Sequence, residues 1–248
     1  MAERRVGVAF AGGNPVEGEQ QKDGFYSTPE DVTWGLLDWL ETSGVLASHV
    51  PPGTPFHECC CGDGRMARIL AMRHPVIATD LVDRGYGDRH GADCDMTRRA
   101  PLRSPVVVTN PPFFGAEAML EHILDQDFLM VAMVLKTTYY NTRGHMRLFR
   151  RCPPAFNLGL TWRPDFRGLG RPVMNVNWFV WLKGNTELPR YDVIARPKLP
   201  EGIMPKIARP PKVKTVSSLK KSVPGLVDPK GRPLEGPPAP VDDLPRAA

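Results

Sequence analysis

The stretch Val106-Val107-Val108-Thr109-Asn110-Pro111-Pro112-Phe113-Phe114 decides the fold that we expect for this chain. A β-branched run bounded by turn residues is typical of a buried strand, and proline cannot continue inside such a strand. The Asn-Pro-Pro-Phe motif is therefore expected in the loop at the carboxyl end of a parallel strand. Open α/β sheets bind their ligands at that end of the sheet.

The motif has a composition that suits a flat ring carrying an amino group. Two prolines fix φ and remove two backbone donors, which leaves the Asn110 amide and nearby carbonyls as rigidly directed acceptors. Phe113 adds an aromatic ring that can stack on the ligand. The alternative is a proline-bounded turn between strand and helix whose phenylalanine enters the core. The candidate catalytic residues are Asn110, Pro111, Pro112 and Phe113.

A second signal precedes this motif. In the stretch 56–65 we expect a short strand that runs into the glycine-flanked turn Gly62-Asp63-Gly64, followed by a helix over 66–71. Glycines let a ligand approach the backbone closely, although only Gly-x-Gly of the six-residue dinucleotide fingerprint is present. The next strand, 76–79, ends in Asp80, close to the spacing at which an acid binds ribose hydroxyls. A turn cap is the alternative role for Asp80.

Two further segments flank these signals. Thr28 is expected to cap a helix that begins at Pro29, with Glu30 and Asp31 in its first turn. Asp95 is expected to end a short strand, where it could accept a hydrogen bond from the exocyclic amine of an adenine. A surface turn is the alternative for Asp95.

The second half of the sheet carries arginines between its predicted elements. We expect a helix over 116–125, a buried strand over 128–135 and two antiparallel strands over 155–162 and 176–182. A basic helix and a loop hold the arginines, which fit either a solvated surface or phosphate contacts, and their density favours phosphate. The candidate nucleic-acid-binding residues are Arg143, Arg147, Arg163 and Arg167.

Composition limits the domain organisation. A chain of 248 residues with 42% hydrophobic residues can form one sizeable α/β domain. We expect a flexible arm over 1–24, the domain over 25–190 and a Pro-rich, basic, disordered tail over 191–248. No apolar run reaches bilayer length and no signal peptide is visible, so we expect a soluble cytoplasmic protein without a membrane partner. The net charge of +5 favours a polyanionic partner.

The five cysteines do not follow a metal-site pattern. Three are adjacent at 59–61, and neighbouring residues of a strand point to opposite faces, so they cannot all reach one ion. No Cys-x-x-Cys partner exists. We therefore expect no metal, reduced thiols and small buried side chains.

In this order, the motifs resemble the S-adenosylmethionine-dependent DNA N6-adenine methyltransferases, especially those of phages and prophages. The late strand Trp178-Phe179-Val180-Trp181 also resembles that group. Two features depart from it: Cys59-Cys60 replaces the usual Pro-aromatic pair, and no target-recognition domain of ordinary size is present. The motif residues are Tyr26, Ser27, Thr28, Pro29, Glu58, Gly62, Asp63, Gly64, Asp80, Asp95 and Asn110 to Phe113.

The resemblance implies an α/β, Rossmann-like class I methyltransferase fold, a mostly parallel seven-stranded sheet with a C-terminal antiparallel hairpin. It implies methyl transfer from S-adenosylmethionine to N6 of an adenine flipped out of duplex DNA, in a bacterial or phage-infected cytoplasm. An RNA adenine methyltransferase, a protein-glutamine methyltransferase and a non-catalytic nucleic-acid-binding protein are the alternatives. The implied cofactor-binding residues are Tyr26, Thr28, Glu58, Gly62, Gly64, Asp80 and Asp95.

Overall fold

A computed structural model describes residues 25–203 of the chain except 99, 113, 114, 169, 171 and 173. The predictions for Phe113, for the arm over 1–24 and for the tail from 204 onward lie outside these described residues. Within them, no helix is long and apolar enough to cross a membrane. The elements are α1 (Glu30–Thr42), α2 (Val45–His49), β1 (Phe56–Glu58), α3 (Arg65–Leu70), β2 (Val76–Asp80), β3 (Arg89–His90), η2 (Ala92–Cys94), β4 (Val106–Thr109), α4 (Ala116–Leu124), β5 (Met130–Lys136), α5 (His145–Arg151), β6 (Phe156–Leu160), β7 (Val176–Leu182) and β8 (Arg190–Ile194).

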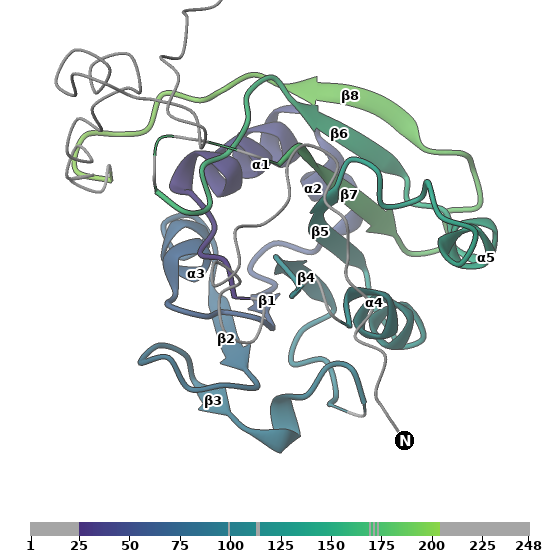
Figure 1. The fold of residues 1–248 in the computed structure, drawn as a ribbon, viewed down its shortest axis with the longest axis horizontal. Helices are drawn as coiled ribbons and strands as arrows, with labels where there is room; N and C mark the ends of the chain where they lie inside the picture. Colours follow the sequence, from purple (N-terminus) through teal and green to yellow (C-terminus); the bar gives the residue numbers. More distant parts are fainter. Residues whose placement is uncertain are drawn as a thin grey trace, which may run out of the picture. The chain divides into compact units, whose positions relative to one another are not determined.

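The described residues form an eight-stranded sheet in the order β3-β2-β1-β4-β5-β7-β6-β8 (Figure 1). Strands β1 to β5 are parallel, in the 3-2-1-4-5 order common to doubly wound folds. Strand β7 is antiparallel to both β5 and β6. The predicted Rossmann-like architecture with an antiparallel late hairpin is confirmed. The predicted strand number of seven is wrong by the additional edge strand β8, which pairs parallel with β6.

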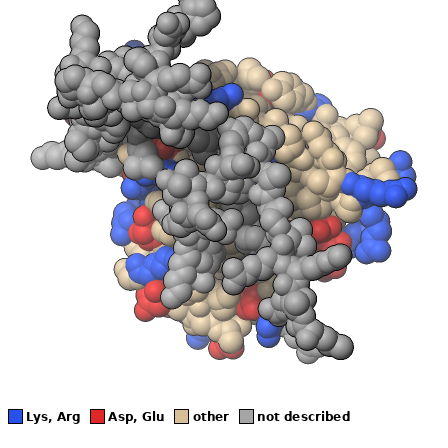
Figure 2. Space-filling model, viewed as in Figure 1, with Lys and Arg blue, Asp and Glu red and all other residues tan. Residues whose placement is uncertain are grey.

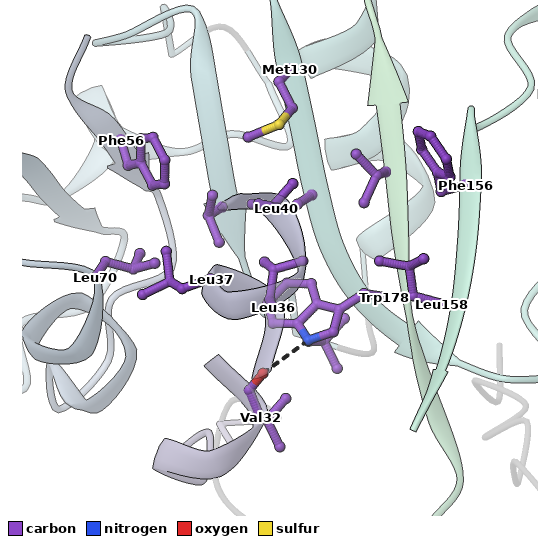
Figure 3. Packing of buried hydrophobic residues seen from close by; sticks show 14 of the residues in the cluster. Val32, Leu36, Leu37, Leu40, Phe56, Leu70, Met130, Phe156, Leu158 and Trp178 are labelled. Carbon is purple, nitrogen blue, oxygen red and sulfur yellow. Dashed lines mark hydrogen bonds between the residues drawn. The ribbon is translucent and has the colours of Figure 1, made fainter. Parts of the chain in front are cut away.

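Helices cover both faces of the sheet. On one face, α1 buries Leu36, Leu37 and Leu40 completely, because these residues recur at helical spacing (Figure 3). Trp178 of β7 packs against them and its indole Nε1 donates to the Val32 carbonyl at 3.1 Å. Helix α4 covers the opposite face. The sheet therefore has a rigid core beneath its carboxyl-terminal edge.

The folded region extends past the predicted boundary at residue 190. Ile194 of β8 is buried, and its Cγ2 occupies the space that a Cβ on Gly35 would fill. Asp192 accepts a hydrogen bond from Trp39 Nε1 at 2.8 Å, and Arg196 Nε pairs with Asp31 Oδ2 at 2.8 Å. The prediction that the tail begins at 191 is therefore wrong for residues up to 203. The sequence pattern missed this part of the fold because the segment has few buried residues, and its prolines and charges resemble those of a linker.

Three local predictions also change. Pro29, not Thr28, occupies the N-cap position of α1, and in the described chain no side chain caps that helix. The cysteines at 59–61 lie in the turn after β1 instead of in a strand. Cys59, Cys61 and Cys94 are buried as expected, whereas Cys60 and Cys152 are only partly buried. Asp95 follows the short helix η2 and does not end a strand.

Candidate functional site

A pocket lies at the carboxyl-terminal ends of β1, β2 and β4. The chain runs outward from β1 through β2 to β3 and then returns to β4 on the other side of β1, so the strand order reverses between β1 and β4. A crevice at such a reversal is the usual ligand site of an open α/β sheet. The predicted site residues that line the pocket are Tyr26, Thr28, Glu58, Asp80, Asp95, Asn110, Pro111 and Pro112.

Asn110 presents one half of its amide to the protein. Its Nδ2 donates to the Tyr26 carbonyl at 3.2 Å and to Thr28 Oγ1 at 3.0 Å. Because a carbonyl can only accept, the amino end of the amide must face Tyr26. No donor among the described residues bonds Oδ1. Asn110 therefore holds a directed hydrogen-bond acceptor in the wall of the pocket.

Asp80 joins the end of β2 to the glycine turn. Its Oδ2 accepts from the Gly62 amide at 2.8 Å, and its Oδ1 accepts from the Val82 amide at 2.9 Å and pairs with Arg84 at 3.3 Å. A carboxylate offers about four acceptor positions. The described contacts use three of them, so Asp80 can still accept from a ligand hydroxyl.

Glu58 lines the pocket and connects the ends of two neighbouring strands. It is 1% exposed, and its Oε1 accepts from Thr109 Oγ1 at 2.5 Å and from the Cys60 amide at 3.1 Å. Burial raises the pKa of Glu58 to about 8, an effect that these two hydrogen bonds oppose. The carboxyl group is therefore mainly protonated at neutral pH. It links the ends of β1 and β4 through Oε1, while no described residue donates to its Oε2.

The glycine turn accommodates aromatic rings of the chain itself. Gly62 and Gly64 have φ of +54° and +79°, a region that favours glycine. A Cβ on Gly62 would lie 2.2 Å from the Phe25 ring, and one on Gly64 would lie 2.2 Å from the Tyr86 ring. We expected these glycines to admit a ligand. In the structure the atoms nearest to them belong to Phe25 and Tyr86, while their neighbours line the pocket.

Asp95 lies in the pocket wall but behaves as a turn residue. Its Oδ1 accepts from the amide and the hydroxyl of Thr97, at 3.0 and 2.6 Å, and its Oδ2 pairs with Arg98 at 3.2 Å. These contacts agree with the alternative of a surface turn. Recognition of an adenine amine by Asp95 stays a prediction.

Four thiols line the pocket, which the sequence pattern did not predict. Cys60 Sγ contacts Met119 Sδ at 3.7 Å, and Cys61 Sγ donates to the Tyr86 carbonyl at 3.3 Å. Burial raises the pKa of Cys61. A side-chain hydrogen bond with Cys59, together with burial, raises the pKa of Cys60, so both are neutral thiols. Between residues 25 and 203, where the chain is described, no group of three His, Cys, Asp or Glu could hold a metal ion. The pocket thiols are Cys59, Cys60, Cys61 and Cys94.

The candidate nucleic-acid-binding arginines lie in two places. Arg147 of α5 and Arg143, just before that helix, are exposed. Figure 2 shows Lys and Arg side chains gathered at the edge of the molecule where Figure 1 places α5. Arg163 and Arg167 flank Phe166, which lines the pocket. Arg163 is exposed, and its Nε donates to Asn175 Oδ1 at 2.8 Å. The second pair is therefore adjacent in sequence to the pocket wall.

No protein-family model and no curated protein matches this sequence. Among solved structures, the backbone is similar to a proposed RNA methyltransferase from Pyrococcus horikoshii, with 15% identity, 64% of this chain and 87% of that chain covered, and a TM-score of 0.48. It is also similar to a proposed class I S-adenosylmethionine-dependent methyltransferase from Listeria monocytogenes, with 10% identity, 73% of this chain and 67% of that chain covered, and a TM-score of 0.48. Magnesium protoporphyrin IX methyltransferase from Synechocystis PCC 6803, crystallised with S-adenosylmethionine, shows 16% identity, with 69% of this chain and 87% of that chain covered and a TM-score of 0.44. At these values the likeness decides nothing about ligand or substrate, so both are argued below from the pocket.

Proposed function

We propose that this protein transfers a methyl group from S-adenosylmethionine to the N6 amino group of adenine in DNA. The observation that carries the proposal is the fixed amide of the pocket residue Asn110, whose amino end is held by Tyr26 and Thr28 while Oδ1 accepts no hydrogen bond from the described residues. An acceptor in this position suits an incoming amine. A bland strand-to-helix turn would not need the Asn110 amide to be held by a segment 82 residues away.

The pocket residues fit S-adenosylmethionine. Asp63, Asp80 and Asp95 line it together with one arginine, Arg84, a balance that favours a ligand carrying a sulfonium and an ammonium group. Asp80 has an acceptor position left for a ribose hydroxyl, and Leu81 and other apolar wall residues suit a purine ring. When bound, the cofactor supplies an electrophilic methyl group. Glu58 lines the same pocket and accepts its described hydrogen bonds on Oε1, which leaves Oε2 for the cofactor contact that the family resemblance implies.

Asn110 and Pro111 would prepare the amine for attack. The lone pair of adenine N6 is delocalised into the ring, so the nitrogen is a poor nucleophile. Hydrogen bonds from its two N–H groups to Asn110 Oδ1 and the Pro111 carbonyl would favour a pyramidal nitrogen with a localised lone pair. That lone pair would form the N–C bond at the expense of the sulfonium C–S bond, whose electrons would stay with sulfur, and one N–H proton would leave to water. Catalysis then comes mainly from orientation.

Exposed arginines outside the pocket support a polymer substrate. Adenine in a duplex must be extruded before its amine can reach an acceptor in the pocket wall such as Asn110. The arginines at 143, 147, 163 and 167 would hold the phosphates on either side of the extruded nucleotide. Phe113 would stack on the extruded base, a role that rests on the sequence motif because this residue lies outside the described ones.

The test is methyl transfer from labelled S-adenosylmethionine to duplex DNA, RNA and protein in parallel, followed by mass spectrometry of the digests. We expect N6-methyladenine in DNA. Label found only in RNA adenine or in protein glutamine would overturn the DNA assignment and leave the methyltransferase assignment standing. Cofactor-independent binding of nucleic acid with no label transferred to any polymer would favour the non-catalytic alternative.

A further inference from the structure

We infer that Thr28 is a positioning residue for Asn110. Its hydroxyl holds the side-chain amide of Asn110 in the orientation in which Oδ1 can accept a hydrogen bond from the amine that is to be methylated. The catalytic consequence of this inference rests on the proposed function. The orientation itself does not, since it concerns only the geometry of two side chains in the protein.

Thr28 is placed where a helix cap is expected but is used elsewhere. It precedes Pro29, which restricts its backbone to extended conformations, and it is 5% exposed. The sequence predicts Thr28 as the helix cap, but Pro29 occupies the N-cap position in the structure. In the described chain no side chain caps α1, and Thr28 Oγ1 accepts from Asn110 Nδ2 at 3.0 Å. The hydroxyl is therefore engaged at the pocket and not at the helix end.

The orientation of Asn110 needs two partners. The last torsion of an asparagine side chain is broad and nearly two-fold, so a half-turn would exchange the amino and carbonyl ends. The exchanged form would point a donor at an incoming amine, which is itself a donor. The Tyr26 carbonyl selects the productive sense, since it can only accept. The Thr28 hydroxyl engages Nδ2 from a second direction and limits the remaining rotation.

The segment that carries Thr28 is anchored on the opposite half of the pocket. Ser27 Oγ donates to Asp63 Oδ2 at 2.7 Å, and the Phe25 ring covers Gly62. The Arg84 guanidinium lies 4.7 Å from the centre of that ring. Residues 25–28 therefore connect the glycine turn to Asn110, and Thr28 is held firmly enough to act as a reference point.

Two substitutions and one control separate positioning from packing. Thr28→Val keeps the shape of the buried side chain and removes the hydroxyl, whereas Thr28→Ser keeps the hydroxyl. The control is Thr33→Val in α1, because Thr33 is fully buried and, among the described residues, its hydroxyl has no partner. Thermal melting confirms that each variant folds.

We expect Thr28→Val to lower kcat for DNA adenine methylation about threefold to tenfold, the size of one neutral hydrogen bond, with unchanged cofactor affinity by calorimetry. Thr28→Ser should recover kcat to within about twofold, and Thr33→Val should match the wild type. A second readout needs no substrate: in ¹⁵N-labelled protein, the side-chain amide signals of Asn110 should shift and exchange faster with water in Thr28→Val, and return in Thr28→Ser.

Unchanged Asn110 amide signals in Thr28→Val would overturn the inference, whatever the activity. Weaker cofactor binding with the same kcat would also overturn it, because Thr28 would then be a cofactor ligand as the family resemblance implies. If the wild-type protein methylates no polymer, the proposed function fails, and the amide signals still decide whether Thr28 orients Asn110.

Discussion

The two halves of the pocket treat their polar groups differently. On the glycine-turn side, the Asp80 and Glu58 carboxyl groups accept hydrogen bonds from backbone amides and side chains of neighbouring strands and turns. On the other side, Asn110 uses its donors on the protein, and no described residue occupies its acceptor. In the first half, carboxyl groups bond mainly to the protein and stabilise the turn. In the second half, the Asn110 Oδ1 acceptor remains for a hydrogen bond from a substrate.

This difference separates two kinds of expected mutational effect. Removing a polar group from the glycine-turn half leaves buried backbone donors without partners, which lowers stability as well as affinity. Removing the acceptor of Asn110 leaves few donors stranded, so the loss should appear mainly in rate. The following predictions test that contrast, beginning with the largest expected effect.

Asn110→Ala should abolish most methylation while the protein folds and binds cofactor. Loss of one group that positions charge or lone pairs at a reacting centre typically lowers the rate about a hundredfold to a thousandfold. Single-turnover kinetics at saturating DNA measure the rate, and calorimetry measures cofactor affinity. Methylation at the wild-type rate would mean that Asn-Pro-Pro is only a turn, and it would remove the distinction between the two halves.

Asp80→Ala should weaken cofactor binding and also lower the melting temperature. Each ligand hydroxyl that loses its hydrogen-bond acceptor costs about 1–3 kcal/mol of binding free energy, which corresponds to roughly fivefold to 150-fold in cofactor affinity. The matched control is Asp88→Ala, because Asp88 Oδ2 likewise accepts from a backbone amide, that of Ala78, at 2.7 Å. The control should lose stability only. Equal cofactor affinity in both variants and the wild type would show that Asp80 supports only the turn.

The buried carboxyl of Glu58 should make the folded protein less stable as pH rises. Its folded pKa of about 8 exceeds its ordinary value of 4.5, so between these values the folded state holds an additional proton. Burial lowers the pKa of His57 to about 4 from 6.5, with Arg103 adding to the effect, so His57 acts in the opposite direction below pH 6.5. Of these two groups only Glu58 acts from pH 6.5 to 8, and its contribution to the free energy of unfolding should fall by up to about 1.4 kcal/mol per pH unit.

Glu58→Gln should remove this fall, since the glutamine oxygen can accept the same two hydrogen bonds from Thr109 and Cys60. Urea denaturation at both ends of the window measures the free energy of unfolding. Glu201→Gln, which alters an exposed carboxyl group, should retain the wild-type fall. A fall that persists unchanged in Glu58→Gln would assign the pH dependence to other groups.

The same contrast explains which features were predictable from sequence. The strand that ends at Asn110 and the acid at Asp80 follow from apolar runs and turn residues, which are local properties of the chain. The bond between Asn110 and Thr28 joins residues 82 positions apart and depends on how the segment before α1 crosses the sheet. Strand β8 lacked a signal because four of its five residues are exposed. Local pattern thus identified the groups, and tertiary contacts determined which of their atoms bond to the protein.

The smallest effect concerns the arginines outside the pocket. If Arg143 and Arg147 contact phosphates, each contributes about 0.9 to the slope of log affinity against log salt concentration, so Arg143→Gln/Arg147→Gln should reduce that slope by up to about two. Deleting residues 204–248, which carry much of the basic tail sequence, should reduce it further. Arg73→Gln is the control, because Arg73 already pairs with Asp38 at 2.8 Å and Glu41 at 2.9 Å. Fluorescence anisotropy with labelled duplex DNA over a salt series measures the slope. If the wild-type affinity is independent of salt, the partner is not a nucleic acid. The amine that donates a hydrogen bond to Asn110 must then belong to a substrate without phosphates.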